Sequence, residues 1–184
     1  MPKTDAQLVE EYLNGTESAF AELTGRYLKT VHNFAYYLSR DKNLADEIAQ
    51  ETFIKIWKNL AKFKQEGNFK TWLLIVARNT ALDWLRKRKA IAFSEFENEE
   101  GSNYLEENIV DLEALPDEAF EEAEKNKVLE KLLLEVPMLY REVLLLHYQE
   151  EVTFEEIAKV LKRPVETVKS QHRRALILLR KRLN

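Results

Sequence analysis

The segment from residue 93 to residue 124 limits the fold more than any other part of the chain. It contains 13 Asp and Glu residues and neither Lys nor Arg, so its net charge is −13. Carboxylates at this density repel one another and cannot be buried together, so the segment cannot join a packed core. We interpret residues 93–122 as a linker that is flexible when free. A spacer that only improves solubility is an equally simple interpretation.

The parts of the chain on either side of this acidic segment are both basic. Residues 1–92 have a net charge of +4 and residues 125–184 a net charge of +5, whereas the whole chain of 184 residues has a net charge of −4. This asymmetry is typical of ends that bind a polyanion and are joined by a like-charged tether. We therefore predict one domain over residues 1–92 and a second over residues 123–184.

Both predicted domains favour helices over strands. The chain has only four glycines and four prolines, which is too few for a turn-rich β protein. It has no cysteine, which excludes disulfides and thiolate metal sites. There is no secretory signal, and no apolar stretch reaches the roughly 18 to 20 residues of a membrane span. We predict an all-α, soluble, cytoplasmic protein without membrane insertion.

Two long helices are predicted in the first domain. Residues 44–60 place apolar side chains at spacings near three and four, and their other face is polar. Gly67 and Asn68 indicate a loop, after which residues 70–89 form a second helix. This helix is apolar nearly all round as far as Ala77, so much of it should be buried. It ends in four consecutive cations, which suit the negative end of the helix dipole.

The second domain contains a short capped helix followed by a longer basic one. Thr153 and Glu156 form a capping box, and Ile157, Ala158 and Leu161 should face the core. Pro164 fits the first position of the next helix, where no amide donor is needed. Before them, residues 138–149 form another apolar helix with four candidate core residues, Leu139, Val143, Leu145 and Leu146.

This order of elements predicts a helix-turn-helix, whose second helix enters the major groove of DNA. Residues 162–184 contain eight cations and one acid, Glu166, and such charge neutralises phosphates. The polar side chains predicted to point outward are Thr167, Lys169, Ser170, Gln171, Arg173 and Arg174. The alternative is a solvated amphipathic helix packed on its own bundle, but the capping box, the spacing and the proline together favour the helix-turn-helix.

Two motifs resemble a known family. YREVLLLHYQEEVTFEEIAKVLKRPVETVKSQHRRA (residues 140–175) resembles region four of the sigma-70 family, in its extracytoplasmic-function group. ADEIAQETFIKIW (residues 45–57) and FKTWLLIVARNTALDWLRKRK (residues 69–89) resemble region two of the same group. The resemblance implies two small helical domains and a sigma factor that binds core RNA polymerase and directs promoter recognition, DNA opening and transcription initiation.

The resemblance also implies a polymerase-binding surface. In that family, the helix that carries the DEIAQE pattern docks on the clamp helices of the polymerase β′ subunit, and region four meets the β flap. The residues that match this pattern are Asp46, Glu47, Gln50, Glu51 and Trp57. Carboxylates can meet basic polymerase side chains, and an aromatic anchor supplies buried area. The alternative is that the polar face of this helix is only solvated and that Trp57 belongs to the core. For Trp57 taken alone, this is the simpler interpretation.

The loop and the helix after it would then bind the minus-ten element of the promoter. Aromatic side chains stabilise unstacked bases by roughly 1–3 kcal/mol each, and a polar residue can read a flipped base. The candidates for this site are Phe63, Asn68, Phe69, Lys70, Trp72, Asn79, Asp83, Arg86 and Arg88. Asn79 matches a base-reading position of the family, whereas Phe69 and Trp72 are as compatible with a core as with a contact.

The outward residues of the last helix would read the minus-thirty-five element as duplex. The family commonly has Gly where Glu166 stands and Arg where Gln171 and Leu176 stand, so the promoter sequence is not implied. The linker would pass through the polymerase, where its carboxylates could be displaced by the transcript. An anti-sigma factor is an expected partner. We expect no cofactor, no metal and no enzyme activity, and an ordinary DNA-binding regulator is the second interpretation.

Overall fold

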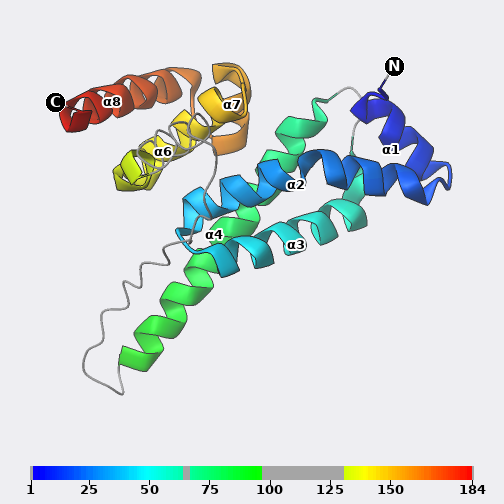
Figure 1. Cartoon of the computed structure of the whole chain (residues 1–184), viewed down its shortest axis with the longest axis horizontal. Helices are drawn as coiled ribbons and strands as arrows, with labels where there is room; N and C mark the ends of the chain where they lie inside the picture. The colour runs from blue at the N-terminus through cyan, green and yellow to red at the C-terminus, as the bar shows by residue number, and fades with distance from the viewer. Residues whose placement is uncertain (1, 64–66, 97–130, 184) are drawn as a thin grey trace, which may run out of the picture.

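The computed structural model of the chain describes residues 2–63, 67–96 and 131–183, and all the regular elements in these ranges are helices (Figure 1). The first group comprises α1 (Asp5–Leu13), α2 (Glu17–Ser39), α3 (Lys42–Asn59), the 3-10 turn η1 (Leu60–Lys62) and α4 (Phe69–Phe96). The second comprises α6 (Met138–Leu144), the π-helical turn η2 (Leu145–Gln149), α7 (Phe154–Leu161) and α8 (Val165–Leu183). The predicted all-α class is confirmed.

Local sequence signals determine where the helices of the first group begin. Thr4 forms a capping box with Gln7 at the start of α1. Asp41 accepts a hydrogen bond from the Leu44 backbone at the start of α3. Arg40, with φ of 59°, ends α2 in the left-handed conformation, so α2 and α3 form a tight helical hairpin. α2, α3 and α4 pack on one another, and α1 packs on α2.

The first half of α4 is the centre of the first group. Leu73, Leu74, Ala77 and Ala81 are buried, which confirms the prediction from the apolar sequence up to Ala77. The helix is longer than predicted, because it continues to Phe96. The predicted start of the linker at residue 93 therefore lies within α4. The rest of the predicted linker, from residue 97 to residue 122, lies outside the described residues.

The second group contains the predicted short helix, turn and long helix. The capping box of Thr153 and Glu156 is present at the start of α7. Lys162 ends α7 in the left-handed conformation, with φ of 52°. α8 begins at Val165, one residue later than predicted, and Pro164 supplies a carbonyl to the Val168 amide.

The predicted core residues of the second group are largely confirmed. Ile157, Ala158 and Leu161 of α7 are buried, as are Val143, Leu145 and Leu146. Leu139 is the exception, because 43% of it is exposed. It lies in the first turn of α6, on the side of the helix that points away from the packed neighbours.

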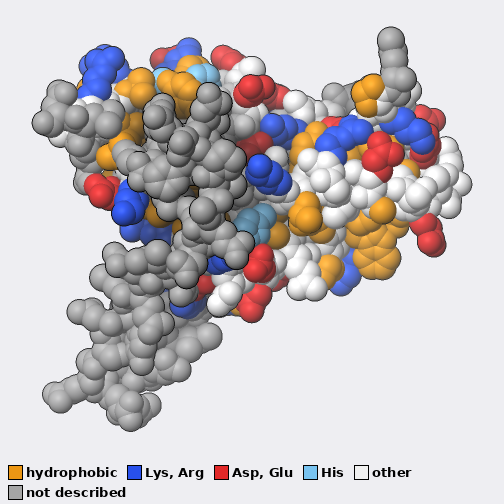
Figure 2. Space-filling model, viewed as in Figure 1, with side chains coloured by type: hydrophobic (Ala, Val, Ile, Leu, Met, Phe, Trp, Pro, Cys, Tyr) orange, Lys and Arg blue, Asp and Glu red, His pale blue; other side chains and the backbone are white. Residues whose placement is uncertain are grey.

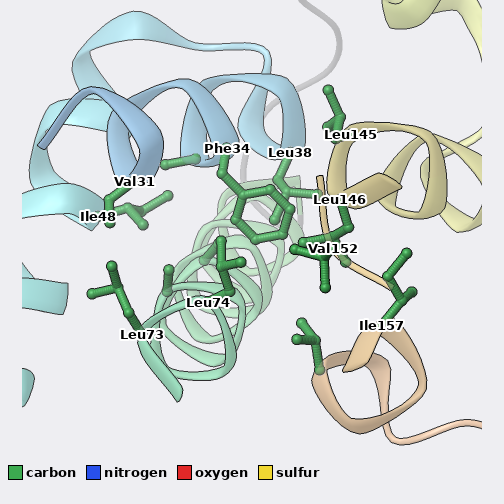
Figure 3. Close-up of a cluster of buried hydrophobic side chains, with 14 of the residues drawn as sticks. Val31, Phe34, Leu38, Ile48, Leu73, Leu74, Leu145, Leu146, Val152 and Ile157 are labelled. Carbon is green, nitrogen blue, oxygen red and sulfur yellow. The ribbon is translucent and has the colours of Figure 1, made fainter. Parts of the chain in front are cut away.

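The two groups of helices share one apolar cluster. Figure 3 shows Leu146 and Val152 of the second group beside Phe34 and Leu38 of α2. All four side chains are at most 5% exposed. α7 also packs on α4, and α6 packs on α2. The second group therefore lies directly on the first. No helix in the described ranges is long and apolar enough to cross a bilayer.

Candidate functional site

An apolar groove lies between α2 and α3. Its volume is about 780 Å³, and Figure 2 shows apolar side chains exposed over these two helices. Leu28, Ile54 and Trp57 leave between 44% and 52% of their surface exposed. The Trp57 indole Nε1 donates to the Tyr12 hydroxyl at 2.6 Å, which holds the ring at the groove. Exposed apolar area of this kind marks a surface for a protein partner.

Polar residues of the predicted polymerase-binding set lie at the edge of this groove. Asp46 and Gln50 line it, and Glu47 is exposed nearby on α3. The Asp46 carboxylate lies 3.0 Å from His32 Nε2. The structure thus brings Asp46, Gln50 and Trp57 together.

Glu51 has different surroundings. Its carboxylate pairs with Lys55 Nζ at 2.7 Å and accepts from the Trp84 indole of α4 at 2.6 Å. The hydrogen bond from Lys55 is the main reason that the pKa of Glu51 lies below its usual range, and the Trp84 hydrogen bond acts in the same direction against the effect of burial. Glu51 therefore links α3 to α4 through the hydrogen bond from Trp84, in addition to adding a negative charge to α3.

Several groove residues were absent from the sequence prediction. They are Phe20, Thr24, Leu28, Lys29 and His32 of α2, and Ala49, Phe53 and Ile54 of α3. Phe53 is one of the apolar side chains at helical spacing in residues 44–60, a pattern that is equally typical of a core residue. The α2 residues had no signal, because their contribution depends on the packing of α2 against α3.

A second, more polar hollow of about 470 Å³ surrounds Asn79. Trp72 and Asn79 come from α4, and residues of α3 and η1 complete the wall; the full lining is Lys55, Asn59, Lys62, Trp72, Val76, Asn79 and Thr80. Lys62 Nζ donates to the Asn59 side-chain oxygen at 3.1 Å, and Lys55 Nζ to the Thr80 hydroxyl at 3.2 Å. The hollow combines amides, cations and one aromatic ring.

The aromatic residues near this hollow form a cluster. The Phe63 ring centroid lies 5.1 Å from that of Trp72 and 5.4 Å from that of Phe69. Phe69 is only 4% exposed and also packs 5.6 Å from Tyr27, so it is a core residue. The sequence left Phe69 open between a core position and a DNA contact, and the structure places its ring in the core, enclosed by its neighbours. Phe63 and Trp72 are partly exposed.

Asn68, the residue before α4, and Lys70 in its first turn do not line the hollow. The Asn68 amide donates to the Glu156 carboxylate of α7 at 2.8 Å. Lys70 Nζ lies 2.9 Å from the Glu150 carboxylate and 2.7 Å from the Glu150 carbonyl oxygen. The structure therefore divides the predicted minus-ten residues into an open set around Asn79 and a set covered by the second group of helices.

The exposed end of α4 carries the remaining predicted residues. Asp83 and Arg86 form an exposed pair at 3.4 Å. Arg88 donates to the Asp41 carboxylate at 2.6 Å, and this hydrogen bond is the main reason that the pKa of Asp41 is lowered. Lys87 lies over the Trp84 ring, with Nζ 5.7 Å from its centroid. Exposed pairs of this kind contribute little to stability.

The outer face of α8 carries five of the six predicted residues: Thr167, Lys169, Ser170, Arg173 and Arg174. Lys169 Nζ lies 3.0 Å from the Glu166 carboxylate in an exposed pair. The prediction that Gln171 points outward is wrong. Gln171 is only 8% exposed, and its side-chain oxygen accepts from Arg163 Nη1 at 3.1 Å, because it lies on the face of α8 that packs against the turn.

Family models match both groups of helices. A model described as Sigma-70 region 2 matches residues 23–91, and one described as Sigma-70, region 4, matches residues 127–179. The chain belongs to the sigma-70 family. Among its relatives, the ECF RNA polymerase sigma factor SigW of Bacillus subtilis is 30% identical over 177 residues, covering 95% of this chain and 94% of SigW. This sigma factor is therefore a member of the extracytoplasmic-function group.

One further relative and two solved structures of the same fold are also similar to this chain. The RNA polymerase sigma-H factor of Pseudomonas aeruginosa is 31% identical over 177 residues, covering 93% of this chain and 89% of the relative. The sigma factor RpoE of Bartonella quintana, solved with the anti-sigma factor NepR, has the same fold, with a TM-score of 0.69, 23% identity and coverage of 89% and 96% of the two chains. CnrH, solved with the cytosolic domain of CnrY, has a TM-score of 0.68, 21% identity and coverage of 97% and 96%.

Membership in this family establishes what the protein does at a coarse level. It is a transcription initiation factor that binds core RNA polymerase and directs it to promoter DNA. α3 and most of α2 and α4 lie in the stretch matched by region 2, and α7 and most of α8 lie in the stretch matched by region 4.

Proposed function

We propose that this sigma factor divides its work between three surfaces. The groove between α2 and α3 binds the clamp helices of the polymerase β′ subunit, with Trp57 as its apolar anchor. The hollow around Asn79 captures bases of the melted minus-ten element. The outer face of α8 reads the minus-thirty-five element as duplex. Residues 1–92 and 123–184 are the corresponding domains.

The polymerase assignment is supported by the combination of apolar and acidic side chains at the groove. Trp57, Ile54 and Leu28 offer exposed apolar area, while Asp46 and Gln50 offer polar groups at its edge. A helical partner can lay an apolar face in such a groove and pair its basic residues with the carboxylates.

The hollow around Asn79 is the observation that carries the minus-ten proposal. A base that leaves the stack needs an aromatic surface, a hydrogen-bonding edge and cations for its phosphates. Trp72, Asn79 and Lys62 supply one of each within the same hollow. Further along the same helix, cations that include Arg86 and Arg88 can contact the phosphates of the DNA backbone.

The minus-thirty-five proposal rests on the exposed polar face of α8. Lys169, Ser170, Arg173 and Arg174 are exposed along one helix that follows a tight turn. In a helix-turn-helix, such side chains at the start of the second helix contact base edges, and the cations further along contact phosphates. The buried Gln171 supports this face from inside rather than contacting DNA.

The protein acts without a catalytic centre of its own, in the cytoplasm where polymerase is found. In the described residues, no group of three or more His, Asp or Glu side chains could hold a metal ion. An anti-sigma factor is a further proposed partner, since RpoE of Bartonella quintana, a sigma factor of this fold, is bound to the anti-sigma factor NepR. The exposed region 2 groove is a surface that such a partner could occlude.

Reconstitution with core polymerase tests this function. Core enzyme with the full chain should start RNA at defined sites of a promoter library, and Asn79→Ala should weaken DNA opening more than closed-complex binding. Equal loss at both steps would contradict base capture by Asn79. Binding of the chain to isolated β′ clamp helices separates a sigma factor from an ordinary DNA-binding regulator, which would bind DNA alone and leave the clamp helices unbound.

A further inference from the structure

Lys55 contributes an ammonium group to the wall of the hollow around Asn79. Its Nζ lies 2.7 Å from the Glu51 carboxylate and donates to the Thr80 hydroxyl at 3.2 Å. The hydrogen bond from Lys55 is also the main reason that the pKa of Glu51 is lowered, so this carboxylate is charged near neutral pH. Two partners, one on α3 and one on α4, therefore fix the ammonium in the wall, and only 36% of the Lys55 side chain is exposed.

The hydrogen bonds of the Thr80 hydroxyl show which proton of Lys55 is left for a ligand. A hydroxyl has a single proton, and that of Thr80 is donated to the Val76 carbonyl oxygen at 2.9 Å. Thr80 is therefore an acceptor toward Lys55 and has no proton to offer a base. An ammonium has three donors, so after Glu51 and Thr80 one N–H of Lys55 has no partner among the described residues. A base in the hollow can use this remaining donor.

The two amide side chains of the hollow have different surroundings. The Asn59 side-chain oxygen accepts from Lys62 Nζ at 3.1 Å, and its nitrogen donates to the Lys55 carbonyl oxygen at 2.9 Å, so Asn59 is part of the wall. The Asn79 side chain is exposed and makes no hydrogen bond to another described residue. An amide carries both donors and an acceptor. Asn79 can therefore pair with an edge of any of the four bases and does not select between them by itself.

The four bases differ in what they offer to a fixed N–H donor. Guanine, cytosine and thymine each carry an exocyclic carbonyl oxygen, whereas adenine carries an amino group and ring nitrogens only. The N1 and N7 atoms of adenine flank that amino group, so donation to either atom brings the amino hydrogens close to the ammonium. Because an ammonium has no acceptor, these hydrogens meet a second donor. A fixed ammonium therefore discriminates against adenine.

We propose that Lys55 determines which base the hollow accepts. Its free N–H donates to an exocyclic carbonyl oxygen, so the hollow selects guanine, cytosine or thymine over adenine. Trp72, which also lines the hollow, offers a ring on which a purine or a pyrimidine can stack, so ring size is not what it selects. The inference rests on the proposed function of the hollow as the site that captures a minus-ten base.

The first test compares adenine with hypoxanthine, a purine of the same size that carries an oxygen in place of the adenine amino group. The probe is a promoter fragment from the library described above, with its minus-ten region kept single-stranded by a non-complementary opposite strand. Each minus-ten position carries adenine or hypoxanthine in turn, and the affinity of the reconstituted holoenzyme is measured by competition. We expect one position at which hypoxanthine binds at least fivefold more tightly than adenine. If no position shows this preference, the proposal is wrong.

The second test asks whether Lys55 causes that preference. Lys55→Met keeps an unbranched side chain of similar length but has no donor. In holoenzyme that contains this variant, the preference for hypoxanthine over adenine at the same position should fall below twofold. A preference that stays at fivefold or more would overturn the assignment to Lys55.

The matched control is Lys58→Met, which removes the same charge one turn further along α3. Lys58 is exposed and does not line the hollow, so the preference for hypoxanthine should stay at fivefold or more. An equal loss of preference in both variants would indicate a general effect of charge and would overturn the proposal. If Lys55→Met lowers the helix content measured by circular dichroism, the comparison of the two bases on the unsubstituted chain still decides.

Failure of this inference differs from failure of the proposed function. If the hollow captures no base, Asn79→Ala will leave promoter opening unchanged, and both proposals are wrong. If Asn79→Ala slows opening but adenine and hypoxanthine bind equally at every position, the hollow still captures a base, and only the selection by Lys55 is wrong.

Discussion

The structure allows the contribution of Trp57 to polymerase binding to be predicted from its exposed surface. Its ring is 52% exposed in the groove between α2 and α3. A Trp side chain has up to about 250 Å² of surface, so covering the exposed half removes about 130 Å² from water, which at about 25 cal/mol per Å² is worth about 3 kcal/mol. Trp57→Ala should therefore weaken binding to core polymerase by about 100-fold.

The assay is titration of labelled chain with core enzyme at fixed salt concentration. Two further variants serve as controls for the loss of apolar area. Trp57→Phe keeps most of the apolar area but loses the hydrogen bond to Tyr12, so its affinity should fall less than tenfold. Leu13→Ala removes a side chain that is 45% exposed on α1 and does not line the groove, and its affinity should not change. If Trp57→Ala bound within threefold of the unsubstituted chain, the groove would not be the docking surface.

Further predictions concern the other surfaces and the domain contact. Asn79→Ala should slow promoter opening about tenfold or more in a fluorescence assay without changing closed-complex affinity. Lys169→Ala and Arg174→Ala should each weaken binding to minus-thirty-five duplex by about 1–3 kcal/mol in a holoenzyme titration. If the lost contact is to a phosphate, the slope of log affinity against log salt concentration should fall by about one. Glu142→Ala leaves two partly buried arginines without their buried carboxylate, so urea unfolding should report about 3 kcal/mol less stability. Because the pKa of Glu156 is lowered in the folded chain, the stabilisation it provides is present above pH 4.5 and should be lost as the pH falls below that value.

The helical elements were predictable because their signals are local. The capping box of Thr153 and Glu156 and the apolar spacing in α7 depend on residues a few positions apart, and both are present in the structure. The end of α4 was less predictable. Cations at residues 86–89 suggested a helix terminus, but nothing in the following residues stops a helix, and α4 continues to Phe96.

The outward position predicted for Gln171 was wrong, and Phe69, which the sequence left open between core and contact, lies in the core. Gln171 is polar and next to outward residues, yet it packs inward because Arg163 offers it a buried hydrogen-bond donor. Phe69 follows a loop, yet Tyr27 and the other rings enclose it. For Phe69, the deciding partner Tyr27 is distant in the sequence. For Gln171, the partner Arg163 lies across a turn, and residue spacing does not specify the geometry of that turn.

The sequence by itself determined the helical class, the position of the helix-turn-helix and the family. Helix capping, apolar periodicity and the motifs each depend on residues that are close together in the sequence. Only the tertiary structure decided which polar residues face solvent and which face another domain. Lys70 and Glu150 are 80 residues apart, and Arg78 and Glu142 are 64 apart. No local pattern pairs them, because the free energy of such contacts exists only once the two domains are packed together.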